Sequence, residues 1–213
     1  THAVLQFRYQ QKRKHLGHKR WGVFPHRVMD RRHPLVADVN TRFDVPHSRF
    51  NEVTRAQFEQ AGLRILVESE TAGVHLATSA DGFRIVFFQG HPEYDTVSLL
   101  KEYKREVARF SKGERPDYPP LLDNYFSLKA QAILDEHRER VVTAHAQGRV
   151  VPEFPEPLIG AGLDNTWHDT AEAVIDNWVG KVYQLTNHDR KLPFQPGIDP
   201  ADPLGLRRDM ARA

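Results

Sequence analysis

One short segment combines an imidazole and a carboxylate at a spacing that could support proton transfer. Residues 88–95 read Phe-Gln-Gly-His-Pro-Glu-Tyr-Asp, and the apolar run Ile85–Phe88 that leads into them has the character of a buried strand. Pro92 biases His91 toward an extended backbone, in which residues two apart point to the same side. The carboxylate of Glu93 could then fix the tautomer of His91 while this imidazole moves a proton for a nucleophile.

The motif alone leaves other readings open. His91 can equally be a solvent-facing residue of a turn with an unrelated Glu93, or the two can be structural partners only. A metal site is not expected, because the 12 histidines are scattered along the sequence without an HExxH motif or a tight cluster. The chain contains no cysteine, which excludes disulfides, thiolate metal ligands and a cysteine nucleophile within these residues.

The composition is that of a globular protein with a core of its own. Of 213 residues, 39% are hydrophobic and 27% are charged, and the net charge of +2 is too small to imply nucleic acid. A basic run from Arg8 to Arg32 could bind nucleic acid or an anionic ligand, but we interpret it as a solvated face balanced by acids elsewhere. No apolar run approaches the roughly 20 residues that cross a bilayer. We expect a cytoplasmic protein with no nucleic-acid or membrane partner.

The apolar periodicity predicts strands mixed with helices, and therefore an α/β fold with only part of its sheet present. The expected strands are 21–24, 63–67, 73–78 and 83–88, and Asp81-Gly82 indicates a hairpin turn between the last two. The expected helices are 1–13, a helix that starts near Asp95 or Thr96, 127–147 and 167–185. Three prolines within 152–157 predict a loop.

Four blocks of the sequence resemble the homoserine O-succinyltransferase (homoserine transsuccinylase) family. The blocks follow the family's order and approximate spacing from Thr1 to about Tyr183. They are Lys19 with Trp21–His26, then Asp44–Phe50, then Glu68–Val74, and last Gly90–Asp95 with Leu99 and Glu102–Arg105. Four blocks that agree in order are far more specific than any one motif.

The resemblance implies a fold and a reaction. The fold is a flavodoxin-like α/β sheet related to class I glutamine amidotransferases, with flanking helices and with the strand that ends at Phe88 inside the sheet. Only its C-terminal portion is expected here. The family transfers an acyl group from acyl-coenzyme A through a cysteine thioester to the hydroxyl of L-homoserine, in methionine biosynthesis. Acyl-coenzyme A and L-homoserine are the expected partners, no cofactor is bound permanently, and a homodimer is left open.

The resemblance also implies roles for five residues by motif position. His91 matches the general base and Glu93 its orienting partner, while Lys19, Ser48 and Arg105 match positions that bind substrate. The chemistry agrees, because Arg105 offers a bidentate fork for a carboxylate and Ser48 a neutral donor and acceptor. Without the resemblance, both cations would be read as surface charges and Ser48 as a turn or capping residue. We expect the five side chains to converge on one cleft near the first helix.

Three features depart from the family pattern. Glu106 occupies a position where aspartate is usual, and residues 127–157 are longer and more charged than the family pattern predicts. The nucleophilic cysteine is missing, and residues 1–5 resemble the start of the helix that follows it. We therefore expect the nucleophile upstream of Thr1 and an inactive 213-residue chain. Residues 1–186 are expected to form part of one acyltransferase domain, followed by a polar tail over 187–213.

Two alternatives compete with this reading. A class I glutamine amidotransferase shares the His-Pro-Glu element, but the Pro46–Arg49 block and the helix with Glu102–Arg105 argue against it. A non-catalytic binding or scaffold relative would lack the nucleophile altogether. A cysteine shortly before Thr1 would favour the enzyme, and its replacement would favour the scaffold. The sequence does not decide between succinyl- and acetyl-coenzyme A.

Overall fold

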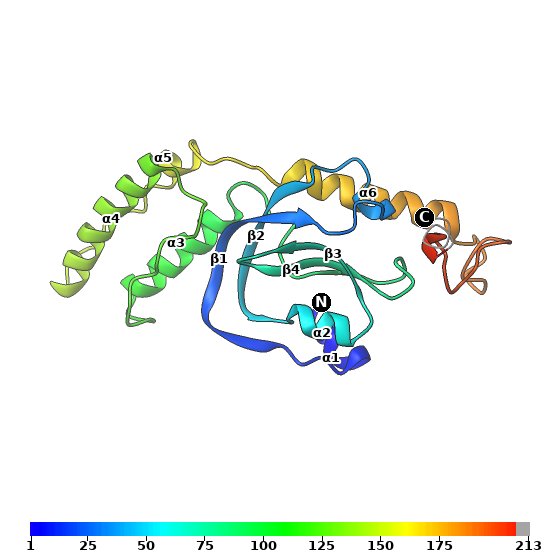
Figure 1. Cartoon of the computed structure of the whole chain (residues 1–213). Coiled ribbons are helices and arrows are strands. Elements are labelled where there is room, and N and C mark those ends of the chain that lie inside the picture. The colour runs from blue at the N-terminus through cyan, green and yellow to red at the C-terminus, as the bar shows by residue number, and fades with distance from the viewer. Residues whose placement is uncertain (208–213) are drawn as a thin grey trace. The chain divides into compact units, whose positions relative to one another are not determined.

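The computed structural model describes residues 1–207, which form a mixed α/β protein (Figure 1). The chain divides into two compact units. The first contains residues 1–20, 24–92 and those from Thr166 onward, and the second contains residues 21–23 and 93–165. The expectation of one domain over 1–186 with a tail over 187–213 remains a prediction.

Five strands form one sheet in the order β2-β1-β3-β4-β5. The strands are β1 (Lys14–Val28), β2 (Arg42–Glu52), β3 (Arg64–Ser69), β4 (Gly73–Thr78) and β5 (Val86–Phe88). The helices are α1 (His2–Tyr9), α2 (Arg55–Gln60), α3 (Ser98–Ser111), α4 (Leu128–Ala146), α5 (Glu156–Gly160) and α6 (His168–Leu185), with a 3-10 turn η1 (Pro34–Val36). The pairs β1–β3, β3–β4 and β4–β5 are antiparallel.

The sheet is strongly curled because β1 and β3 stay together over only a short stretch. Their register joins Arg27 to Glu68 and Val28 to Val67, and the rest of β1 bends away with β2 beside it (Figure 1). The inner faces of strands that are not neighbours in the sheet order can therefore approach one another.

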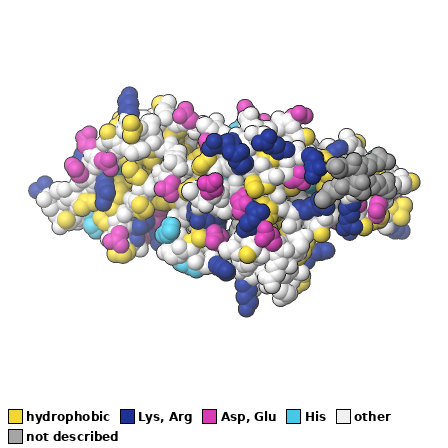
Figure 2. Space-filling model, viewed as in Figure 1, with side chains coloured by type: hydrophobic (Ala, Val, Ile, Leu, Met, Phe, Trp, Pro, Cys, Tyr) yellow, Lys and Arg dark blue, Asp and Glu magenta, His cyan; other side chains and the backbone are white. Residues whose placement is uncertain are grey.

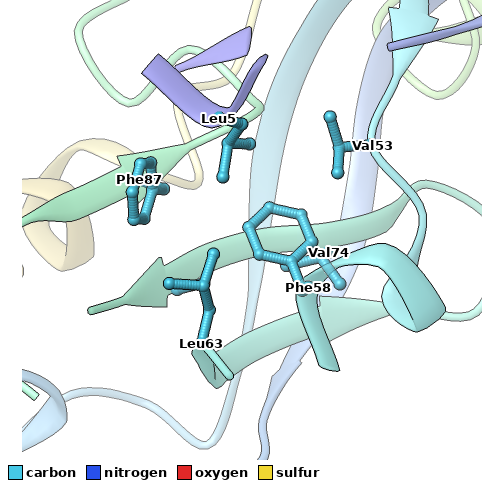
Figure 3. Packing of buried hydrophobic residues seen from close by; sticks show 7 residues of the cluster. Leu5, Val53, Phe58, Leu63, Val74 and Phe87 are labelled. Atoms are coloured by element: carbon cyan, nitrogen blue, oxygen red, sulfur yellow. The ribbon is translucent and has the colours of Figure 1, made fainter. Parts of the chain in front are cut away.

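Helices cover both faces of the sheet in the first unit, and each face has its own apolar core. Helices α1 and α2 close one face, where the buried side chains meet as Figure 3 shows. This cluster consists of Leu5, Val53, Phe58, Leu63, Val74, Ala77 and Phe87. On the other face, η1 and α6 cover a second cluster of Val28, Leu35, Val36, Leu66, Val67, Leu76 and Val174. The helical spacing of residues 167–185 therefore predicted α6 close to its observed bounds, and Val174 of this helix is buried in the second cluster.

The α/β class is confirmed, but several elements differ from the sequence predictions. The strand that ends at Phe88 was expected inside the sheet, and this is wrong for the described sheet, because β5 stands at its edge and pairs with β4. The paired strands above are antiparallel, so they do not by themselves form the parallel sheet of a flavodoxin-like fold. The first helix ends at Tyr9, since Gln10 takes a left-handed φ of 58° and β1 follows. Strand β2 and helices α2 and α5 were not predicted.

The turn between β4 and β5 is longer than a two-residue hairpin. The Asp81 carboxylate accepts hydrogen bonds from the backbone N–H groups of Phe83 and Arg84 and from the Ser79 hydroxyl. Gly82 supplies the left-handed φ of 79° that the turn needs. Because the turn uses these residues, the paired part of β5 begins at Val86 rather than at residue 83.

The second unit is helical. Ser127 caps α4 by accepting the Ala130 N–H, and α3 buries an apolar stripe that includes Tyr103 and Val107. The Glu102 carboxylate of α3 accepts the Trp21 indole N–H at 3.1 Å and the Tyr94 hydroxyl at 2.6 Å. In the motif Glu102–Arg105, the first two residues therefore hold the unit together.

The surface carries mixed charge. In the face shown in Figure 2, acidic and basic side chains lie interspersed, with hydrophobic side chains between them. Over residues 1–207, no helix combines the length and the apolar character that crossing a membrane requires.

We predict that Phe58→Ala lowers the free energy of unfolding by about 3–5 kcal/mol, as measured by urea denaturation. Phe58 is 0% exposed and meets Phe87 edge to face, so truncation leaves a cavity in the first apolar cluster. Phe7→Ala is the matched control, because the Phe7 side chain is 86% exposed and its loss should change stability by less than about 0.5 kcal/mol. Equal effects of the two substitutions would contradict this assignment of the core.

Candidate functional site

The segment that carries His91 leaves the sheet at the end of β5 and passes from one strand to another. The Gln89 N–H donates to the backbone oxygen of His75 on β4 at 2.9 Å, which extends the β4–β5 ladder by one bond. The next N–H, that of Gly90, donates to the His75 ring at Nδ1 over 3.2 Å. The His91 N–H then donates to the backbone oxygen of Pro46 on β2 at 2.8 Å. The backbone N–H groups of three consecutive residues, Gln89, Gly90 and His91, therefore all donate hydrogen bonds.

The side chain of Gln89 holds the same segment through further hydrogen bonds. It is buried, and its amide nitrogen donates to the backbone oxygens of Val53 at 3.0 Å and Val74 at 2.7 Å. Its oxygen accepts the Val53 N–H at 2.8 Å and lies 3.0 Å from Nε2 of His2. Every hydrogen-bonding group of this amide therefore has a partner, as a buried amide requires.

Gly90 lies directly on two histidine rings. A Cβ atom at this position would stand 2.9 Å from Nε2 of His47, 2.9 Å from Nδ1 of His75 and 2.5 Å from Cγ1 of Val45. These distances are shorter than real Cβ contacts, so a glycine is needed here because of close packing. The residue before His91 is therefore in contact with the layer of histidines below it.

Three buried histidines from three strands form that layer, which we call the histidine cluster: His26 of β1, His47 of β2 and His75 of β4. The rings of His26 and His47 stack with centroids 5.1 Å apart and an interplanar angle of 7°. The His75 ring stands edge-on to both, at 5.4 Å from His26 and 6.1 Å from His47. The curl of the sheet brings these rings together although β3 separates β1 from β4 in the strand order.

The hydrogen bonds of the cluster fix one neutral tautomer for each ring. Arg49 Nε–H donates to His47 Nδ1 at 3.1 Å, so the proton of the neutral His47 ring is on Nε2, which faces His26 Nε2 at 3.3 Å. His26 then accepts at Nε2 and donates from Nδ1 to the Phe24 oxygen at 2.8 Å. Because His75 accepts the Gly90 N–H at Nδ1, its proton is on Nε2.

Burial keeps these rings uncharged. It lowers the pKa of His26 to about 4, with the Arg49 cation also lowering it and the Asp44 carboxylate opposing this. It lowers the pKa of His47 and of His75 well below the ordinary value, and the neighbouring histidines and Arg49 act in the same direction. A buried imidazole loses the hydration of its charged form, which explains the direction.

Arg49 is the cation at the end of this chain of hydrogen bonds. Its guanidinium also donates to the backbone oxygens of Asn51 at 2.8 Å and Ala72 at 2.6 Å, and it lies 3.8 Å from the Glu52 carboxylate. Burial, followed by the Arg20 cation, lowers the pKa of Arg49 to about 10, and Glu52 opposes this. Arg49 therefore remains charged at neutral pH and orients the cluster from one end.

Three of the five residues expected to form the site belong to the first unit. Lys19 is on β1, Ser48 is on β2 between the buried His47 and Arg49, and His91 follows β5. All three are partly exposed, and His91 is the residue that the backbone bonds above hold in place. Their assignment as substrate-binding and catalytic residues stays a prediction.

The other two residues, Glu93 and Arg105, belong to the second unit. Both are exposed, and Arg105 is on α3 with its side chain 64% exposed and its Nε 3.7 Å from the Glu106 carboxylate. Glu106 also accepts a hydrogen bond from Arg115 at 3.0 Å. A glutamate in place of the usual aspartate thus has a structural partner here.

A cavity of about 660 Å³ opens where β1 and β2 bend away from β3. It is lined by residues of both charges, among them Arg27, Arg42, Glu68 and Glu70, and by the buried His26. None of the residues expected to form the site is among its lining residues. It is therefore a hollow separate from the segment that carries His91.

The histidine cluster was missed by sequence reasoning, which treated the 12 histidines as scattered. A signal was present, because His47 and Arg49 alternate along β2 and both face inward. Most ring nitrogens of the cluster are occupied by hydrogen bonds to one another, to Arg49 or to the backbone. Over the described residues, no group of three or more His, Asp or Glu side chains could hold a metal ion.

Comparison with known proteins agrees with the four sequence blocks. The model of the homoserine O-succinyltransferase family matches residues 1–188, and the chain belongs to this family. A relative from Allochromatium vinosum named homoserine O-succinyltransferase is 70% identical over 206 residues, which cover 97% of this chain and 58% of the relative. Relatives of the same name from Thioalkalivibrio nitratireducens and Nitrosococcus oceani are each 65% identical over 98% of this chain and 58% of their own length. The chain therefore spans 58% of the length of these curated relatives.

We predict that the free energy of unfolding decreases as the pH is lowered from about 6.5 toward about 4. In this window the unfolded chain protonates its histidines, whereas buried rings such as His26, with a pKa of about 4, stay neutral. Each such ring contributes a slope of up to about 1.4 kcal/mol per pH unit, and this contribution is complete above the unfolded pKa. Urea unfolding at several pH values measures the slope.

His26→Asn should reduce this slope, because it removes one titrating ring and can retain the donor to Phe24. His188→Asn is the matched control, since it removes a histidine that is exposed. An unchanged slope in His26→Asn would contradict the assignment of a neutral buried ring.

Proposed function

We propose that the chain is the part of a homoserine O-acyltransferase that supplies its general base and most of its substrate contacts. The whole protein would transfer an acyl group, most simply succinyl, from acyl-coenzyme A to L-homoserine as a step of methionine biosynthesis in the cytoplasm. Membership of the homoserine O-succinyltransferase family carries this proposal. The hydrogen bonds that fix the backbone at Gly90 and His91 support the proposal independently, since a general base must be kept in one orientation.

The proposed reaction has two acyl transfers. A cysteine thiolate attacks the thioester of acyl-coenzyme A and releases coenzyme A, and the homoserine hydroxyl then attacks the new thioester and regenerates the thiol. His91 would take the proton of the nucleophile in each attack and return it to the leaving group. Glu93 would orient the imidazole and stabilise its charged form. Lys19, Ser48 and Arg105 would bind substrate.

The nucleophile is proposed to precede the first helix, because the 213 residues contain no cysteine. The contacts of α1 support this position. The Phe88 N–H donates to the Thr1 hydroxyl at 3.2 Å, and the same hydroxyl donates to the Phe88 oxygen. His2 lies 3.0 Å from the Gln89 side chain. A residue just before Thr1 would therefore emerge beside the edge of β5, close in space to the segment of His91 although far from it in sequence.

The same edge bears on the finer fold assignment. We propose a flavodoxin-like sheet for the whole protein from the family resemblance alone. In the described residues β5 is at the end of the strand order, and the Thr1 hydroxyl already takes the outer N–H and oxygen of Phe88. The homodimer remains a prediction without a specific observation in its favour.

We predict that His91→Ala lowers turnover about 100- to 10,000-fold in a protein that carries the upstream segment with its cysteine, because general acid-base help has this magnitude. The measurement is homoserine-dependent release of coenzyme A from succinyl- and acetyl-coenzyme A. His188→Ala, at an exposed histidine, is the matched control. The 213-residue chain alone should be inactive.

Four outcomes would contradict this proposal. Near-normal turnover in His91→Ala would remove the proposed general base. Homoserine-dependent release by the 213-residue chain alone would overturn the thioester mechanism. Failure of the extended, cysteine-bearing protein with both donors would overturn the proposed activity, and a missing upstream cysteine would favour the scaffold.

We predict that Arg105→Lys raises the KM for homoserine about 10- to 100-fold with little change in the KM for acyl-coenzyme A. An ammonium cannot reproduce the two-pronged contact of a guanidinium with a carboxylate, and a hydrogen bond to a charged group is worth about 1.5–3 kcal/mol. Arg109→Lys is the matched control, because Arg109 is also exposed on α3 and contacts Glu106. Equal KM values for Arg105→Lys and the parent would remove Arg105 from the site.

A further inference from the structure

At the end of β5, the ring of His75 replaces the backbone of β4 as the hydrogen-bond acceptor. The β4–β5 ladder pairs Leu76 with Phe88, and the His75 backbone oxygen continues it by accepting the Gln89 N–H at 2.9 Å. At Gly90 the acceptor is no longer a backbone oxygen but Nδ1 of the His75 side chain, at 3.2 Å. The chain can therefore turn out of the sheet at Gly90 without leaving a buried N–H unpaired, which would cost about 1–3 kcal/mol.

We propose that His75 is a positioning residue for His91, which acts by holding the Gly90 peptide in the one orientation from which the His91 N–H reaches Pro46. The functional part of this inference rests on the proposed role of His91 as general base. The contacts of His75 with Gly90 are independent of that role. His75 would not touch substrate. Its role would be to keep the proposed base in a fixed position relative to the reacting groups.

The packing around His75 leaves its ring little freedom. The ring is buried, and it stands between the rings of His26 at 5.4 Å, His47 at 6.1 Å and Phe88 at 5.5 Å. Gly90 lies against it so closely that a Cβ would approach Nδ1 to 2.9 Å. A ring fixed on both sides fixes the peptide bonded to it, because neither partner can move alone.

The charge state of the cluster suits this task. An imidazole accepts a hydrogen bond only at an unprotonated nitrogen, so His75 can hold Gly90 only while it is neutral. Burial lowers the pKa of His75 well below its ordinary value, and the facing groups His26, Arg49 and His91 act in the same direction. His75 therefore stays a hydrogen-bond acceptor under conditions where a general base such as the proposed His91 must gain and lose its proton.

The choice of histidine at this place is explained by two requirements at once. The site needs an acceptor at the position of Nδ1 and a flat ring that fills the space between His26, His47 and Phe88. Asparagine can place an oxygen near the Nδ1 position, so His75→Asn keeps the acceptor and loses volume. His75→Leu keeps much of the volume and loses the acceptor. The pair of variants separates hydrogen bonding from packing.

The first test uses the 213-residue chain labelled with ¹⁵N, in which NMR follows the hydrogen exchange of the Gly90 and His91 amides. We expect His75→Leu to raise the exchange of both amides about tenfold, because one net hydrogen bond is lost and the His91 N–H is no longer directed to Pro46. We expect His75→Asn to stay within about threefold of the parent, because it keeps an acceptor for the Gly90 N–H. Unchanged exchange of the Gly90 and His91 amides in folded His75→Leu would overturn the proposal.

The matched control is His33→Leu. His33 is buried in the same unit, and its Nδ1 also accepts a backbone N–H, that of Leu35 at 3.3 Å. The His33→Leu variant should be less stable than the parent without a change in Gly90 exchange. Equal changes in Gly90 exchange in His33→Leu and His75→Leu would mean that His75 has only a structural role, and would overturn the proposal. Should His75→Leu not fold, His75→Phe, which keeps a flat ring and loses the acceptor, tests the same contact, and unchanged Gly90 and His91 amide exchange in His75→Phe would overturn the proposal.

The second test uses the protein extended by the upstream segment. We expect kcat for homoserine acylation to fall about tenfold in His75→Leu and to recover in His75→Asn, with the KM for homoserine within about threefold of the parent. A change in KM alone would contradict a positioning role. If the extended parent protein has no acyltransferase activity, the proposed function fails, and the exchange measurement still decides whether His75 positions His91.

Discussion

The hydrogen bond from the Gly90 N–H to the neutral, buried ring of His75 organises the whole segment around His91. It lets the chain leave the sheet without an unpaired N–H and directs the His91 N–H to Pro46 on another strand. Gly90 must be a glycine for the same reason, since any side chain would collide with His47 and His75. The motif Gly-His-Pro-Glu is thus as much a packing motif as a chemical one.

The curl of the sheet makes this arrangement available. Because β1 and β3 pair over only two residues, β1 and β2 can bring His26 and His47 against the β4 histidine. A layer of imidazoles this deep is costly if it is charged, and Arg49 at its end raises that cost further. The chain of donors from Arg49 through His47 to His26 satisfies the ring nitrogens of His47 and His26 while both rings stay neutral.

Apolar periodicity predicted several elements of the fold, whereas polar residues inside the sheet concealed others. Strands β3 and β4 are short and largely apolar, helices α4 and α6 carry apolar residues at helical spacing, and all four were found close to their observed bounds. Strand β2 was missed because its inward positions include His47 and Arg49, which hide the alternation of a strand. His91 was found from local spacing, whereas His75 is a matter of tertiary contact: its partners lie on other strands, and no pattern along the chain predicts their meeting.

The positioning of His91 requires a histidine cluster that is neutral, with one defined tautomer for each ring, and ring ¹⁵N NMR of the chain can observe both properties. At pH 7 we expect the proton on Nε2 of His47 and His75 and on Nδ1 of His26. His26, whose pKa burial lowers to about 4, should remain singly protonated down to about pH 5, and burial lowers the pKa of His47 and His75 in the same direction. A doubly protonated ring in the cluster between about pH 6 and 7, or His75 with its proton on Nδ1, would contradict this arrangement.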